Sequence, residues 1–507
     1  MKNIIALDLG TSSMRSILYT DKGKALAAFG HEYHSEYPKP SWVEQNPDTW
    51  KKASADVLSQ MAAFMKEHGH RAEGIAVTSQ RSSLIPMDAE GKPLRHAIMW
   101  QDKRTIEQCE ILKSEYGLEN LYRLTGLRLN PYFVMPKIRW FRQNEAGLCG
   151  RMKKVLGVQD FVVYCLTGEY ATDYTQAGRT MLMNIQKFRW EEELLRIAGI
   201  GEEQLPRLVP PGTAVGKLTP EFASLTGLPS GLPVVISGGD QQNAAVALGV
   251  TAPGMAEANT GTGSFVLAYA EKAEFDPSGR VLVQASAMAG KWVIEAGIFN
   301  TGSIYRWFKE QYCPDLAALP KPYVKMDEEA AAAGPGSHGV VMIPHFEGSA
   351  APYWNPMAKG LFFNLSLGTT RGDMNRAILE GISMEINGCL ELIQNLTGSL
   401  TAVNVAGGMV KSDLFCQIQA DFYDKPVIRF ENNEASSLGA SIVAATALGL
   451  HGSLEEAIKA MSPNVDKVFQ PEPNDKPLVQ KLMAAKKKLY TALTDGEVYE
   501  HFMGLVK

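Results

Sequence analysis

The fold is decided near the start of the chain, by the stretch Ile4-Ile5-Ala6-Leu7-Asp8-Leu9-Gly10-Thr11-Ser12-Ser13-Met14-Arg15-Ser16-Ile17-Leu18-Tyr19. Its two apolar runs predict two buried strands that are joined by a tight polar turn. Asp8 stands at the end of the first strand, where a carboxylate can hold a hydrated divalent cation.

The turn itself is rich in hydrogen-bond donors. Gly10 lets the backbone turn sharply, and Arg15 adds positive charge on the return strand. Amide and hydroxyl donors that could face an anion come from Thr11, Ser12 and Ser13. The turn therefore suits the triphosphate of a nucleotide, although an ordinary solvated β-turn would have the same composition.

Length and composition narrow the class of protein. A chain of 507 residues is too long for one hydrophobic core, so two or more domains are expected. It is 45% hydrophobic and 21% charged, as is usual for a soluble globular protein. The net charge of -5 gives no reason to expect nucleic acid or an anionic membrane as a partner.

The sequence also indicates where the protein works. No apolar run approaches the roughly 20 residues that span a bilayer, and Asp8 interrupts the N-terminal run before a signal peptide could form. The six cysteines are scattered and include no CxxC pair. We therefore expect reduced thiols and a cytoplasmic location.

A second polar turn resembles the first one in its composition. Thr260-Gly261-Thr262-Gly263-Ser264-Phe265 lies between two apolar runs in the second half of the chain. The likeness predicts a duplicated α/β architecture, with one domain over residues 1–248 and another over 249–507. Between them, the apolar run Pro233-Val234-Val235-Ile236-Ser237 leads into Gly238-Gly239-Asp240-Gln241-Gln242, at the end of a strand where α/β proteins place ligands.

Several helices can be placed in advance. Asn46-Pro47-Asp48 predicts a helix start, with the helix running to His68 and ending at Gly69. Residues 105–225 are expected to be mostly helical. The longest helix is predicted over 373–396, where Gly381 and Gly388 share a face and would permit close packing.

Common nucleotide signatures are absent, since no Gly-Lys pair precedes Ser or Thr and Gly261-x-Gly263 lacks a third glycine. Instead, small-residue motifs follow apolar strands in a fixed order. With these motifs the chain resembles the FGGY carbohydrate kinases, which belong to the actin/hexokinase/Hsp70-like ATPase superfamily. The matching motifs are Asp8-Leu9-Gly10-Thr11, Trp42-Val43-Glu44-Gln45, Trp100-Gln101-Asp102, Gly239-Asp240-Gln241-Gln242, Asn259 to Gly263, Ala351-Pro352-Tyr353-Trp354 and Gly407-Gly408.

The resemblance implies two ribonuclease H-like α/β domains with an active site in the cleft between them. It also implies ATP and Mg²⁺ as cofactors, with Asp8 near the metal. The nucleotide-binding positions carried over are Thr11, Ser12, Ser13, Arg15, Gly261, Thr262, Gly263, Gly302, Arg306, Gly407, Gly408 and Ser412. For each glycine the alternative remains that it only permits a tight turn.

The resemblance assigns the reaction to Asp240, which matches the family's catalytic base; it could equally cap the helix that follows. The residues that match the polyol contacts of glycerol kinases are Arg81, Trp100, Tyr132, Gln241 and Phe265. One position departs, because glycerol kinases have Arg-Glu where this chain has Arg81-Ser82. A shorter, neutral Ser82 would leave room for a longer acceptor.

We therefore expect ATP-dependent phosphorylation of a primary hydroxyl on a small polyol or ketose, with a four- or five-carbon, xylulose-like acceptor favoured. The alternative within the family is a glycerol kinase. An alternative from another class is a non-catalytic nucleotide-dependent module of the actin or Hsp70 type, which would need no base aimed at a sugar hydroxyl. The sequence leaves open a homodimer or homotetramer.

Overall fold

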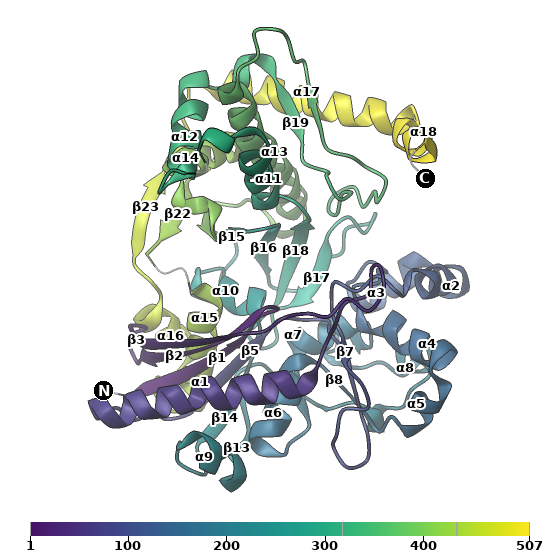
Figure 1. Ribbon diagram of the computed structural model, residues 1–507, viewed down its shortest axis with the longest axis vertical. Helices are drawn as coiled ribbons and strands as arrows, with labels where there is room; N and C mark the ends of the chain where they lie inside the picture. The colour runs from purple at the N-terminus through teal and green to yellow at the C-terminus, as the bar shows by residue number, and fades with distance from the viewer. Residues whose placement is uncertain (1, 317, 432–433, 506–507) are drawn as a thin grey trace.

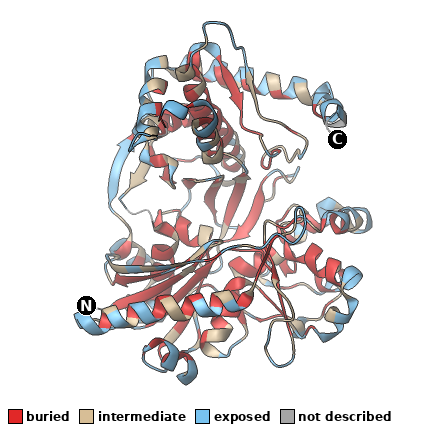
Figure 2. Cartoon of the chain, viewed as in Figure 1, coloured by how far each residue is buried: buried red, intermediate tan, exposed pale blue. Residues whose placement is uncertain are grey.

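Two β-sheets organise the molecule, one from each half of the chain (Figure 1). The computed structural model describes residues 2–316, 318–431 and 434–505. Figure 2 shows that buried residues concentrate in both sheets and in the helix faces that cover them. The predicted two-domain α/β architecture is thus confirmed.

The first sheet begins with the antiparallel meander of the opening stretch and continues with two strands parallel to β1. Ile4 to Leu7 are fully buried because helices cover both faces of β1. The six strands, in spatial order, are β13 (Thr213–Lys217), β14 (Pro233–Gly239), β5 (Ile75–Ser79), β1 (Asn3–Leu9), β2 (Ser13–Thr20) and β3 (Ala25–Glu32).

The second sheet repeats this plan. Strands β15, β16 and β18 form an antiparallel meander, and β21 and β22 continue the sheet parallel to β15. The expected duplication is therefore present. The seven strands, in spatial order, are β17 (Leu282–Ala285), β18 (Trp292–Ile298), β16 (Ser264–Ala270), β15 (Met255–Thr260), β21 (Ala402–Ala406), β22 (Val427–Phe430) and β23 (Val465–Phe469).

Helices α10 (Asp240–Ala247) and α15 (Ala435–Ala447) lie on the inner face of the first sheet, and α10 also packs on the second sheet. Although α15 comes from the second half of the chain, it packs with the first sheet (Figure 1). Helices α1 (Pro47–His68) and α6 (Val158–Thr167) cover the outer face of the first sheet. Helices α11 (Gly302–Tyr312) and α13 (Arg371–Thr397) pack on the outer side of the second.

Helix α1 has the ends that the sequence predicts. The Asn46 side chain accepts a hydrogen bond from the amide of Asp48, and Pro47 is the first helical residue. Gly69 ends the helix in the left-handed conformation with φ of 69°. Trp50 and Met61 on its inner face are fully buried against the sheet.

The segment between β5 and β14 is less helical than expected. Residues 105–225 hold several short strands that tie helices together, so the prediction of a mostly helical segment is only partly right. Its strands are β8 (Lys154–Leu156), β9 (Ala171–Asp173), β10 (Met183–Asn184), β11 (Arg189–Trp190), β12 (Arg207–Val209) and β13. Its helices besides α6 are α2 (Ile106–Tyr116), α3 (Leu118–Thr125), α4 (Val134–Asn144), α5 (Ala146–Arg151), α7 (Tyr174–Ala177), α8 (Glu192–Ala198) and α9 (Pro220–Thr226).

Of the two glycines of α13 that were predicted to pack closely, only Gly381 does so. A Cβ at Gly381 would lie 2.6 Å from the carbonyl oxygen of Met342, so the close packing is confirmed there. At Gly388 no atom lies within 4 Å of a Cβ placed there, so that part of the prediction is wrong.

The remaining elements are β4 (Glu44–Gln45), β6 (Ile85–Met87), β7 (Ala97–Ile98), α12 (Pro322–Ala333), β19 (Val341–Ile343), β20 (Leu361–Phe363), α14 (Asp413–Tyr423), α16 (Leu454–Met461), α17 (Lys476–Asp495) and α18 (Val498–Leu505).

Two expectations from composition can be compared with the structure. All six cysteines are free thiols, as expected. Over residues 2–316, 318–431 and 434–505, no helix combines the length and apolar character that a membrane span requires.

Candidate active site

Three parallel strands end side by side at one edge of the first sheet. Leu9 of β1 pairs with Ser79 of β5, and Ser79 pairs with Gly239 of β14. Asp8, Arg81 and Asp240 therefore stand around one point, although they are far apart in sequence. This edge is where α/β proteins bind ligands.

Asp240 is held by the way its helix begins. Gly238 has φ of 120°, and a Cβ at Gly239 would lie 2.6 Å from Cδ of Arg81, so only glycine fits this approach. The Asn243 amide donates to the Gly238 carbonyl at 3.0 Å, which fixes the first turn of α10. Asp240 is the first residue of α10 rather than its cap, and its Oδ1 accepts from the amide of Gln241 at 2.7 Å.

A buried charge network surrounds this carboxylate. Nε of Arg81 lies 3.5 Å from Oδ1 of Asp240, and Nη1 of Arg81 donates to Glu295 at 2.9 Å. Arg179 donates to the other oxygen of Glu295 at 2.8 Å. Burial raises the pKa of Asp240, while Arg81 acts in the opposite direction. A carboxylate with a raised pKa is the better proton acceptor, as a general base requires.

Aromatic rings line the space beside Arg81. Trp100 and Tyr132 pack with ring centroids 5.2 Å apart, and the Arg81 guanidinium lies 5.9 Å from the Phe265 ring. The indole of Trp100 donates to Oγ1 of Thr11 at 3.0 Å. This bond joins the aromatic cluster to the first polar turn. The structure thus brings the expected acceptor residues together around the end of β5.

Asp8 lies close to two other acidic groups. Its pKa is raised to about 7, first by burial and then by Asp240 and Glu434, while Arg15 lowers it. Arg15 forms an ion pair with Glu434, so it joins the two halves of the chain. Carboxylates that repel one another in this way fit a Mg²⁺ ion that keeps most of its waters. Among the described residues, no group of three or more His, Cys, Asp or Glu could ligate a metal directly.

A large cavity of about 700 Å³ opens in the second half of the molecule. Its walls come from the turn after β15, from α11, from α12 and the residues before it, from Leu379 of α13, and from the segment that leads into α14. Six of the predicted nucleotide residues line it: Gly261, Thr262, Gly302, Arg306, Gly408 and Ser412. This volume suits a nucleotide-sized ligand.

The other predicted nucleotide residues take different positions. Gly263 and Gly407 allow close contacts between backbone segments. A Cβ at Gly263 would lie 2.5 Å from the carbonyl oxygen of Ile298, and a Cβ at Gly407 would lie 2.4 Å from that of Thr260. Ser12 and Ser13 remain in the first turn with Thr11, on the side of Asp8.

Sequence reasoning missed part of this cavity. Tyr305 and Tyr323 stack with centroids 5.7 Å apart and line it together with Asp327. The Tyr305 hydroxyl donates to Asp327 at 2.9 Å. Burial raises the pKa of Asp327, while Ser412 and Tyr305 lower it by hydrogen bonding. An aromatic pair beside a carboxylate can bind a heterocyclic base by stacking and by accepting from an amino group.

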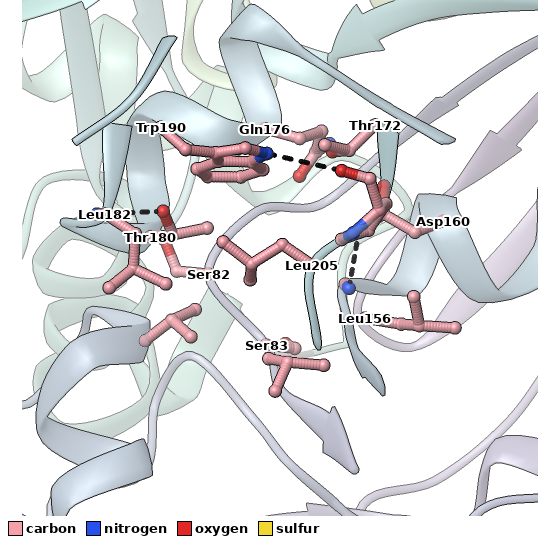
Figure 3. Close-up of a pocket in the computed structure, with 14 residues that line it drawn as sticks. Ser82, Ser83, Leu156, Asp160, Thr172, Gln176, Thr180, Leu182, Trp190 and Leu205 are labelled. Atoms are coloured by element: carbon pink, nitrogen blue, oxygen red, sulfur yellow. Dashed lines mark hydrogen bonds between the residues drawn. The ribbon is translucent and has the colours of Figure 1, made fainter. Parts of the chain in front are cut away.

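Ser82 faces a much smaller space than expected. It has φ of 71°, and its hydroxyl is buried without a hydrogen-bond partner among the described residues. Figure 3 shows Ser82, Ser83 and Asp160 around this pocket, which has a volume of about 20 Å³. That is room for about one water molecule, and none of the other predicted acceptor residues lines this pocket.

Other contributors to the site were also missed. Glu295 is the one acidic residue inside the apolar strand β18, and a lone charge in a buried strand signals a buried partner. Lys137 likewise falls on the apolar face of α4, with Val134 and Ile138. Arg179 follows Gly178 in a short helical turn and gave no comparable signal.

Comparison with known families covers most of the chain. Residues 3–247 match the N-terminal domain of the FGGY family of carbohydrate kinases. Residues 256–448 match the C-terminal domain of the same family.

Individual relatives agree with this match. A glycerol kinase of Thermococcus gammatolerans is 34% identical over 474 residues, which are 92% of this chain and 93% of that protein. A ligand-bound xylulose kinase from Lactobacillus acidophilus superposes with a TM-score of 0.92 at 25% identity, over 99% of this chain and 100% of that one. A Plasmodium falciparum glycerol kinase with ADP superposes with a TM-score of 0.89 at 25% identity, over 97% and 98%.

Proposed function

Because the chain belongs to the FGGY family of carbohydrate kinases, we propose that it transfers the γ-phosphate of ATP to a primary hydroxyl of glycerol. The observation that carries the proposal is the position of Asp240 beside Arg81, whose guanidinium also lies 5.9 Å from the Phe265 ring. The sequence-similar glycerol kinase supports this acceptor. The alternative, a non-catalytic module of the actin or Hsp70 type, is less well supported, because it needs no such base.

In the proposed reaction Asp240 accepts the proton of the attacking hydroxyl. Arg81 holds the Asp240 carboxylate in place, and Arg81 and Gln241 bind the remaining hydroxyls of the acceptor. The side-chain oxygen of Gln241 is buried without a hydrogen-bond partner among the described residues, so it is available to accept from a hydroxyl. Trp100 and Phe265 pack on the carbon skeleton. The phosphates of ATP reach across from the large cavity and accept hydrogen bonds from Thr11, Ser12 and Ser13. Most of the catalysis comes from positioning the two substrates and from stabilising the charge of the transferred phosphoryl group.

Asp8 is the proposed residue for Mg²⁺, through the waters of the ion. The raised pKa of Asp8 and its acidic neighbours fit a hydrated cation at this point. The ion would neutralise charge on the β- and γ-phosphates. Arg15 lies on the same side and could turn from Glu434 to a phosphate.

A second candidate is a four- or five-carbon acceptor such as xylulose. Ser82 in place of glutamate motivated it, and the structural likeness to a xylulose kinase favours it. The position of Ser82 weighs against it, because Ser82 lines a small separate pocket that none of the other proposed acceptor residues lines, so its shorter side chain gives no support for added room beside Asp240. The glycerol alternative is therefore the better supported of the two.

The test measures kcat/KM for glycerol, erythritol, xylulose and ribulose by ADP release. We expect glycerol to give the highest value. The matched control is Asp240→Asn, which keeps the volume and should lower glycerol-dependent turnover by about 10²–10⁴-fold. A preference for xylulose would overturn the glycerol assignment, and turnover of Asp240→Asn within a few-fold of the wild-type value would remove Asp240 from the mechanism.

A cytoplasmic location is part of the proposal and is supported by the free thiols. Assembly as a homodimer or homotetramer stays a prediction, which sedimentation of the purified protein would check.

A further inference from the structure

Lys137 is a buried lysine whose hydrogen bonds go to the backbone. Its side chain is fully buried on α4. The Nζ donates to the carbonyl of Ser82 at 2.7 Å and to the carbonyl of Tyr132 at 2.8 Å. Both acceptors are uncharged, and burial lowers the pKa of Lys137 to about 7, so a buried amine is here used to hold main chain.

The two carbonyls belong to two different segments that contribute residues to the proposed acceptor site. Ser82 directly follows Arg81, whose guanidinium contacts Asp240. Tyr132 packs on Trp100, and the Arg179 guanidinium lies 5.0 Å from the Tyr132 ring. A single nitrogen therefore joins the turn after β5 to the loop before α4.

The turn at Ser82 needs such a support. Its φ of 71° is in the left-handed region, which strains the backbone of a residue that has a side chain. The Ser82 hydroxyl itself has no hydrogen-bond partner among the described residues, so it gives the turn no support. The bond from Lys137 to the Ser82 carbonyl opposes relaxation of the turn, and any relaxation would move Arg81.

We propose that Lys137 is a positioning residue that sets the spacing of the acceptor site, by fixing Arg81–Ser82 relative to Tyr132. The inference rests on the proposed function, because it concerns the same acceptor site. It predicts an effect on the polyol and not on the nucleotide, since the large cavity is lined only by residues from Gly261 onward.

The test replaces Lys137 with Met, which has a similar length but no donor. In Lys137→Met the two carbonyls lose their partner, and we expect the KM for glycerol to rise at least tenfold. The KM for ATP should change less than threefold. A residue that only stabilised the fold would lower the amount of active enzyme without separating the two KM values.

The chain offers a matched control in Lys154. Its Nζ also donates to two backbone carbonyls, those of Glu203 at 2.7 Å and Leu205 at 3.0 Å, and neither belongs to the acceptor site. Lys154→Met should leave the KM for glycerol within twofold of wild type. Equal changes in both variants would overturn the proposal.

The remaining outcomes are also decisive. If wild-type protein releases no ADP with any polyol, the proposed function itself fails. If wild type is active and folded Lys137→Met keeps its KM for glycerol, only the present inference fails. If Lys137→Met does not fold, the test uses Lys137→Gln, whose side-chain amide can still donate to a carbonyl. That variant should raise the KM for glycerol more than twofold but less than tenfold. If neither variant folds, Lys137 serves stability and the proposal is overturned.

Discussion

Two adjacent glycines, Gly407 and Gly408, follow strand β21 and differ in what surrounds them. Gly407 has φ of 96°, and a Cβ there would lie 2.4 Å from the Thr260 carbonyl oxygen. Gly408 has an ordinary φ of -67°, lines the large cavity and has no atom within 4 Å of a built Cβ. The first glycine is therefore required by the backbone, and the second leaves space for a ligand.

We predict that Gly408→Leu weakens ATP binding at least tenfold without loss of stability, because the new side chain enters the cavity. Calorimetric titration with ATP and a thermal melt would measure both. The control is Gly407→Ala, which should destabilise the fold through its positive φ and the close carbonyl. Unchanged ATP affinity in folded Gly408→Leu would place the nucleotide elsewhere.

Asp160 is a buried carboxyl with consequences for stability. It lies in the first turn of α6, and its Oδ2 accepts from the amide of Gly157 at 2.8 Å. Burial raises its pKa to about 7, with the Gly157 bond acting in the opposite direction. In the unfolded chain the pKa of aspartate is about 3.9. Between these values the folded protein holds a proton that unfolding releases, so the Asp160 contribution to stability falls as pH rises from about 4 to about 7.

Asp160→Asn should remove this dependence, since the amide stays neutral. We expect the free energy of unfolding of the variant to gain on wild type by about 4 kcal/mol between pH 4 and pH 8, since the shift of about three pKa units is worth about 1.4 kcal/mol per unit. Urea unfolding at several pH values would measure it. A difference that is constant with pH would show that Asp160 does not titrate in this range.

At the scale of single elements, the sequence predicts best where local chemistry decides. The ends of α1 follow from Asn46, Pro47 and Gly69, whose preferences do not depend on distant contacts. The short strands within residues 105–225 could not be predicted in this way. β8 pairs with β6 and β9 with β12, so each exists only through a partner from another part of the chain.

Helix α13 offers a test of element packing. Gly381 touches the backbone of β19, whereas Gly388 has open space around a built Cβ. We predict that Gly381→Ala destabilises the protein by about 1–3 kcal/mol through overpacking. Gly388→Ala should stabilise it by about 0.5–1 kcal/mol, because alanine favours the helix. Chemical unfolding of both variants measures the difference, and equal effects would contradict this packing.

At the scale of the whole molecule, the candidate site was predictable where motifs end strands. Asp8 and Asp240 each close an apolar run, and the parallel strands bring these ends together. Glu295 and Lys137 were missed as contributors because their partners, Arg81 and the Ser82 carbonyl, come from segments more than 50 residues away. Only the assembled fold reveals such pairs.

The two halves of the chain meet most closely where α15 crosses α10. A Cβ at Gly439 would lie 1.8 Å from the carbonyl oxygen of Asn243, so the helices touch backbone to backbone. Asn243 is one turn after Asp240 on α10, and its side chain anchors that turn to Gly238. Any group added at Gly439 must therefore displace the helix that carries the proposed base.

We predict that Gly439→Ala lowers kcat at least tenfold, although Gly439 lies in α15 and lines neither the acceptor site nor the large cavity. A displacement of about 1 Å at a reacting group can cost about 10²-fold in rate. Overpacking should also lower the free energy of unfolding by about 1–3 kcal/mol. Steady-state kinetics with ATP and glycerol, together with thermal melts, would measure both effects. Gly388→Ala is the control, since the same substitution there meets no atom and should leave kcat unchanged. Wild-type kcat in Gly439→Ala would mean that α10 keeps its position when α15 moves, and that the halves are coupled elsewhere.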